Sequence, residues 1–131
     1  MLGLASLLGF LGLPRVAALA LAILLIEQTH LSLEDLAHRT GYARSCLSSH
    51  LKSLAARGLV EITREGRRVL YRARAESITK LLVEHLASLR ALLITASQSL
   101  ERSDISWLLK GLSNDLSRII GKFRSRGGVH D

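Results

Sequence analysis

The chain has 131 residues, of which 48% are hydrophobic, and a formal net charge of +7 at pH 7. This length predicts one domain with extensions, and the single cysteine excludes an intrachain disulfide. Aromatic residues make up only 4% of the chain, too few for the stacking platform of a single-strand binder.

The positive charge is concentrated in the middle of the chain. Nine Lys and Arg residues oppose four Asp and Glu residues within 31–75, whereas eight oppose six within 76–131. Residues 1–30 hold one residue of each sign. The central segment is therefore predicted to face a polyanion such as duplex DNA.

Two apolar segments open the chain. Residues 1–13 carry no charge and predict a short apolar helix or arm, and Pro14 begins a second helix that ends near Gln28. Neither segment reaches the roughly 20 apolar residues of a membrane span, so a cytoplasmic protein is expected. A membrane-anchored regulator is the alternative. The side chains expected to pack on a second subunit are Leu7, Leu8, Phe10 and Leu11.

Residues 32–57 predict two short helices joined by a tight turn. Ser32 and Asp35 have the spacing of a capping box, in which each side chain bonds the other residue's backbone N–H. Gly41 ends the first helix, because glycine adopts the left-handed conformation at little cost. The second helix is expected over about residues 44–57.

The two faces of this second helix differ in character. At about 100° per residue, Leu47, Leu51 and Leu54 share one face and are expected in the core. The opposite face is small, polar and basic, so its side chains can approach phosphates and base edges. The candidate DNA contacts on this helix are Arg44, Ser45, Cys46, Ser49, His50, Lys52 and Ser53.

A β-hairpin is predicted next. Residues 59–63 and 69–71 are rich in β-branched and aromatic side chains, and residues 64–68 join them as a tight turn. The turn carries three cations that would hold phosphates or enter a minor groove. The candidate wing contacts are Arg64, Arg67 and Arg68.

Residues 14–72 resemble the winged helix-turn-helix of prokaryotic transcription regulators. The resemblance rests on Thr-Gly-Tyr at 40–42, Ser-Cys-Leu-Ser-Ser-His-Leu at 45–51 and Arg-Gly-Leu-Val at 57–60, a pattern similar to the MarR, ArsR and TrmB group and to small archaeal regulators. It implies a recognition helix in the major groove and a wing against the adjacent backbone. Cys46 departs from the pattern, in which a small polar residue such as Thr is usual.

Two helices with coiled-coil spacing end the chain. Residues 76–102 and 105–123 each repeat an apolar side chain at alternate steps of four and three, and 103–104 form a break. An antiparallel hairpin follows, and two hairpins would form a four-helix bundle across a two-fold axis. A hairpin without a dimer is the alternative. The expected dimer contacts are Leu82, Leu86, Leu89, Leu93, Leu100, Leu109, Leu112, Leu116 and Ile119.

The predicted fold class is mainly α with a small β-hairpin wing: a winged helix-turn-helix with a C-terminal antiparallel helical hairpin for dimerisation. Its parts are the apolar arm over 1–13, the DNA-binding domain over 14–75, the dimerisation region over 76–123 and a flexible tail over 124–131.

Other chemistry has weaker support in the sequence. The five histidines show no paired metal-ligand spacing and no catalytic set emerges, so neither a metal, a cofactor nor an enzyme is expected. Cys46 near a helix N-terminus could serve as a thiol switch, although a small side chain in place of Thr is the simpler interpretation. Tyr42 and Trp107 could line a pocket for a small-molecule effector, with core packing as the simpler interpretation.

The sequence therefore predicts a homodimeric transcription regulator that binds specific double-stranded DNA. The alternative is a winged helix that docks on a protein partner in a transcription or membrane assembly. Such a module would be expected to expose apolar residues on its second helix, which here exposes serines and a lysine.

Overall fold

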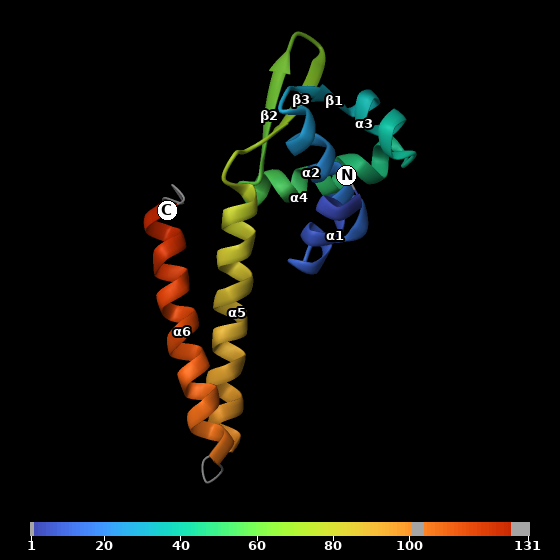
Figure 1. The fold of residues 1–131 in the computed structure, drawn as a ribbon. Coiled ribbons are helices and arrows are strands. Elements are labelled where there is room, and N and C mark those ends of the chain that lie inside the picture. The colour runs from blue at the N-terminus through green and yellow to red at the C-terminus, as the bar shows by residue number, and fades with distance from the viewer. Residues whose placement is uncertain (1, 101–103, 127–131) are drawn as a thin grey trace. The chain divides into compact units, whose positions relative to one another are not determined.

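The computed structural model describes residues 2–100 and 104–126 (Figure 1). The chain divides into two compact units, Met1–Ile78 and Thr79–Asp131. The predicted fold class is confirmed, with one additional short strand. In chain order the elements are α1 (Leu2–Phe10), α2 (Arg15–Glu27), β1 (Leu31–Ser32), α3 (Leu33–Thr40), α4 (Arg44–Ala56), β2 (Val60–Glu65), β3 (Arg68–Ala73), α5 (Ser77–Ser99) and α6 (Asp104–Arg126).

Helix α2 is the centre of the first unit. Its sequence is apolar on every side, so it is stable only when neighbours cover several of its faces. It packs against α1, α3, α4 and β3, and most of its side chains from Ala17 to Leu24 are buried. No helix in the described part of the chain is long and apolar enough to cross a membrane.

Helix α1 corrects part of the expectation for the N-terminal arm. Leu8 and Leu11 were expected to pack on a second subunit, but both are buried within their own unit, where α1 packs on α2. The reason is that α2 presents an apolar face that α1 covers. Leu7 and Phe10 point outward, and Phe10 is 73% exposed.

The helix-turn-helix has the predicted capping. The Ser32 Oγ accepts from the Asp35 N–H at 3.1 Å, and the Ser32 N–H donates to Asp35 Oδ2 at 3.1 Å. Gly41 ends α3 with a φ of 79°, a conformation that an L side chain rarely adopts. The Thr40 hydroxyl donates to the Leu36 carbonyl at 2.8 Å and accepts from the Tyr42 N–H at 3.2 Å, which fixes the turn into α4.

The sheet is larger than predicted. It has three antiparallel strands in the order β1-β3-β2, because Leu31 pairs with Tyr71 and Ser32 with Leu70. The hairpin strands are six residues each, and the register runs as far as the pair Glu65–Arg68. The turn is therefore two residues long, with Gly66 first at a φ of 63°, as a type II′ turn requires.

The second unit is an antiparallel pair of helices, α5 and α6, which lie side by side in Figure 1. The Ser106 hydroxyl of α6 donates to the Ser97 carbonyl of α5 at 3.0 Å, and Arg90 donates to the Ser117 hydroxyl at 3.4 Å. Ser97, Ser106 and Ser113 are buried. Small polar side chains thus contribute to the contact between the two helices.

The C-terminal boundary also differs from the prediction. Helix α6 continues to Arg126, so residues 124–126 of the predicted flexible tail are helical. The three residues that follow the predicted end at 123 are compatible with a helix, and the glycine pair comes directly after them. The predicted break at residue 103 and the tail over 127–131 lie outside the described residues.

Candidate nucleic-acid interface

Helix α4 presents its predicted polar face to solvent. Leu47, Leu51 and Leu54 are buried and fix the rotation of the helix, as expected from their spacing. Two of the seven candidate residues, Cys46 and His50, are half-buried at the edges of this face, and Cys46 is a free thiol. The exposed candidates are Arg44, Ser45, Ser49, Lys52 and Ser53.

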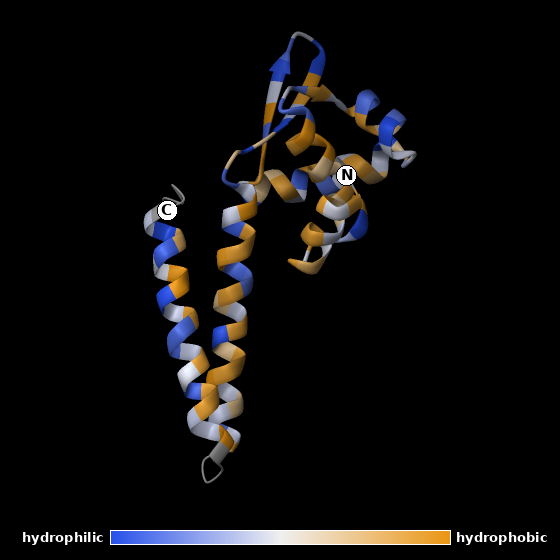
Figure 2. Ribbon diagram, viewed as in Figure 1, coloured by the Kyte–Doolittle hydropathy of each residue, from blue (hydrophilic) through white to orange (hydrophobic). Residues whose placement is uncertain are grey.

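A groove of about 630 Å³ lies between α4, the start of α3 and the wing. It brings together Arg44 and Lys52 from α4 with all three candidate arginines of the wing, Arg64, Arg67 and Arg68. Five cations that are separated by up to 24 positions in the sequence therefore line one concave surface. Figure 2 shows the hydrophilic character of the wing tip. The other candidates of α4 lie outside this lining.

Each arginine of the wing has its own position. Arg64 pairs with Val69 across the ladder, Arg67 is the second residue of the turn, and Arg68 begins β3. All three are exposed. The wing therefore extends a cluster of cations beyond the buried part of the sheet, which ends at Tyr71.

Two titratable groups beside the groove are perturbed. Backbone and side-chain hydrogen bonds from Ser32 lower the pKa of Asp35, and the Arg68 and Arg39 charges lower it further. Burial raises the pKa of the Tyr71 hydroxyl, against a smaller opposing effect of the Arg64 charge. At neutral pH Asp35 is therefore a carboxylate and Tyr71 a neutral phenol.

Glu34 was not predicted as a site residue, yet it lines the groove. Its Oε1 lies 3.0 Å from Nη1 of Arg44, so an ion pair joins the first turn of α3 to the start of α4. In the sequence, an acidic residue just after an N-cap indicates helix capping and dipole stabilisation. Only the turn geometry brings this carboxylate to the recognition helix.

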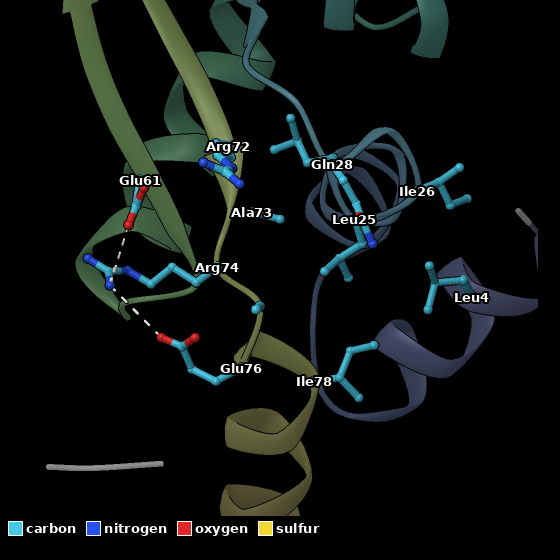
Figure 3. Close-up of a pocket in the computed structure, with 12 residues that line it drawn as sticks. Leu4, Leu25, Ile26, Gln28, Glu61, Arg72, Ala73, Arg74, Glu76 and Ile78 are labelled. Carbon is cyan, nitrogen blue, oxygen red and sulfur yellow. Dashed lines mark ion pairs between the residues drawn. The ribbon is translucent and has the colours of Figure 1, made fainter. Parts of the chain in front are cut away.

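A second cavity of about 630 Å³ lies elsewhere in the first unit (Figure 3). Leu4, Ile26 and Ile78 contribute apolar walls, and Arg72 and Arg74 also line it. Arg74 Nη1 lies 3.6 and 3.9 Å from the carboxylates of two glutamates, the ion pairs drawn in Figure 3. This cavity could not be predicted from the sequence, because its walls come from five separate elements.

The aromatic residues considered for an effector pocket lie in different units. Tyr42 lines a groove of about 490 Å³ with residues of α1 and α2. Trp107 is 69% exposed on α6, so it does not serve as a core residue of its own unit. Among the described residues, no group of three His, Cys, Asp or Glu side chains could hold a metal ion.

Helices α5 and α6 keep their leucine seams accessible. Leu89, Leu100, Leu112 and Ile119 are exposed, although large apolar side chains normally gain about 1.5–3 kcal/mol from burial. The other candidates for the dimer contact are half-buried, namely Leu82, Leu86, Leu93, Leu109 and Leu116.

Known proteins resemble this chain in sequence pattern and in fold. A model of the MarR family matches residues 11–68. A solved transcriptional regulator is 20% identical with a TM-score of 0.55 over 95% of each chain, which shows a shared fold. No curated protein matches.

Two further solved structures are less similar in shape. The transcriptional regulator BldR from Sulfolobus solfataricus is 28% identical over 76% of this chain and 73% of its own, with a TM-score of 0.42. BpsR from Bordetella bronchiseptica, whose DNA binding is regulated by 6-hydroxynicotinic acid, is 23% identical over 78% and 76%, with a TM-score of 0.48.

Proposed function

Because a model of the MarR family of winged helix-turn-helix transcription regulators matches residues 11–68, we propose that the chain is a regulator of this family in which α4 and the wing bind specific duplex DNA. In this proposal the chain is a DNA-binding transcription regulator rather than an enzyme. The family binds DNA as dimers, so a second copy of the chain is the expected partner. The observation that carries the residue assignment is the groove in which five cations from α4 and the wing meet.

The polar face of α4 supplies the base contacts in this proposal. Ser45, Ser49 and Ser53 are exposed and short, so they allow the helix to approach the floor of a major groove closely. Lys52 lies on the same face and can bond either a phosphate or a guanine. Cys46 and His50 stand at the edges of the contact, where their half-buried side chains limit their reach.

The wing supplies the backbone contacts. Arg67 and Arg68 lie at the end of the hairpin that is farthest along the ladder from Val60 and Ala73. Arginine is suited to this position, because its guanidinium bonds two phosphate oxygens in one plane or enters a narrow minor groove. Arg64 is the residue before the last of β2 and lines the same groove.

The leucine seams are proposed as the dimer contact. At about 100° per residue, Ser97 lies about 60° from the seam of α5, and the face that contains Ser106 and Ser113 lies about 90° from the seam of α6. In both helices the serine face is reached from the seam by rotating in the direction in which the chain winds. Because the helices are antiparallel, these rotations are opposite in space. Both seams therefore belong to one side of the hairpin, where a second hairpin would complete a four-helix bundle.

The second cavity is proposed as a site for a small-molecule effector. It combines apolar walls at Leu4, Ile26 and Ile78 with the guanidinium of Arg72, for which no ion pair with another described residue is found. An apolar carboxylate fits this combination. A titration of DNA binding with benzoate tests it: Arg72→Ala should abolish any response, and an unchanged response rejects the site.

Selection of bound sequences from random duplex DNA tests the function itself. A symmetric dimer predicts enrichment of an inverted repeat with half-sites about one helical turn apart, about 34–36 Å between centres. Recovery of unselected sequence at low salt would contradict specific recognition. In that case the protein-docking alternative takes over.

A further inference from the structure

The DNA groove contains a negative charge that a phosphate-binding surface does not need. Among the described residues that line it, Glu34 is the one carboxylate, beside five Lys and Arg side chains. Its Oε1 contacts Nη1 of Arg44 at 3.0 Å. Arg44 is the first residue of α4, so this carboxylate lies at the end of the recognition helix that enters a groove first.

Stability of the fold does not explain this ion pair. The Glu34 side chain is 78% exposed and the Arg44 side chain 62%, and exposed pairs contribute little to folding. A carboxylate in this groove would also repel the phosphates of bound DNA. Glu34 should therefore weaken general DNA binding unless it has another role in the complex. A role in the bound state is therefore the more informative explanation.

We propose that Glu34 is a positioning residue that sets the specificity of the DNA contact by holding Arg44. The inference rests on the proposed function of α4. A guanidinium has five N–H donors in a fixed plane, and the Glu34 carboxylate accepts from one of them, at Nη1 of Arg44. The adjacent negative charge disfavours a phosphate at Arg44, while the remaining donors can bond N7 and O6 of a guanine. Glu34 thus reserves Arg44 for a base and leaves the phosphates to the other cations.

The variant Glu34→Gln tests this proposal through salt dependence. Without the carboxylate, Arg44 becomes free to bind a phosphate. The slope of log affinity against log salt should then become steeper, more negative by about 0.9. Binding to a scrambled duplex should then fall an additional 3.5-fold or so between about 50 and 200 mM salt. At low salt the affinity for the scrambled duplex should rise more than the affinity for the selected site. The specificity ratio, selected over scrambled affinity, should therefore fall.

Glu27→Gln is a matched control. Glu27 Oε1 lies 2.9 Å from Arg39 Nη1 in another exposed pair, between α2 and α3, and neither residue lines the groove. The control removes the same charge from the chain. If both variants change the affinity for the two duplexes alike, net charge alone accounts for the effect and the positioning role is rejected.

A second background shows whether Glu34 acts through Arg44. In Arg44→Ala, the additional replacement Glu34→Gln should leave the salt slope and the specificity ratio unchanged, because the side chain that it positions is gone. A full effect of Glu34→Gln in that background overturns the proposal. The melting temperature should be the same in all variants. Wild-type protein that binds no duplex would instead reject the proposed function.

Discussion

Ser32 takes part in three structures at once. Its backbone pairs with Leu70 in the sheet, its hydroxyl caps α3, and it lines the groove between α4 and the wing. The Asp35 carboxylate accepts the reciprocal bond from the Ser32 N–H. These two residues therefore fix the start of α3 relative to β3, and with it the edge of the proposed DNA contact.

Acid should destabilise the first unit partly through Asp35. Bonds from the Ser32 N–H and hydroxyl hold the pKa of Asp35 below its ordinary 3.8 in the folded state. A lowered folded pKa gives stability that is present above the unfolded pKa and is lost as the pH falls through the folded value. Urea unfolding between about pH 5 and pH 2 should therefore show a flatter acid decline for Asp35→Asn than for wild type. Equal slopes would reject this role.

Ser49 should carry sequence information rather than general affinity. It is exposed in the middle of the polar face of α4, and loss of a base contact costs about 1–3 kcal/mol at the cognate site and little elsewhere. Ser49→Ala should therefore narrow the gap between selected and scrambled duplexes in an anisotropy titration. Ser88→Ala, at an exposed serine of α5, is the control. A uniform loss on both duplexes would contradict base contact.

At the level of elements, the strong periodic patterns of the sequence were sufficient to predict the helix-turn-helix. Ser32, Gly41 and the leucines of α4 predict element ends and a buried face, because caps and periodicity are local features. β1 was missed, since two residues show no alternation and the strand exists only by pairing with β3. The antiparallel pairing of α5 and α6 was predicted, but the serines in their contact were missed, because leucines give a stronger pattern than serines.

Some residues of the groove could be predicted from local sequence, and others could not. The cations of α4 and the wing could be identified from the local charge excess and the family resemblance. Glu34 could not, because its distance to Arg44 depends on the turn between two helices. The second cavity, formed by five elements, has no local sequence pattern that could predict it.

The wing should contribute affinity without sequence preference. Arg67→Ala combined with Arg68→Ala removes two proposed phosphate contacts and should flatten the salt slope by about 1.8 for both selected and scrambled duplexes. Lys110→Ala with Arg118→Ala removes the same charge from exposed positions of α6 and should change the slope much less. Unchanged binding by the wing variant at every salt concentration would show that the wing does not touch DNA.

Helix α1 should stabilise its own unit. Leu8 is fully buried against α2, and replacement of a buried leucine by alanine costs about 2–5 kcal/mol through lost burial and the remaining cavity. Leu8→Ala should therefore lower the free energy of unfolding in urea by that amount, whereas Leu2→Ala, at an exposed residue of the same helix, should have little effect. Similar small effects of both would place α1 outside the folded unit.

For the whole molecule, the proposed function depends on the leucine seams, parts of which one chain leaves exposed. Leu112 is 46% exposed on the seam side of α6, and Leu89, Leu100 and Ile119 of the two seams are also exposed. A second copy would bury both seams and place two recognition helices for an inverted repeat. The proposed specificity and the proposed dimer therefore depend on each other.

The mass of the complex with the selected duplex tests this account most directly. Multi-angle light scattering should give two copies of the chain per duplex, and a dimer for the free protein at micromolar concentration. Leu112→Asp places a charge in the seam and should give a monomer with weakened DNA binding, whereas Asn114→Asp, on the other side of α6, should remain a dimer. One wild-type copy per duplex, bound as tightly as to the full repeat, would contradict the dimeric regulator.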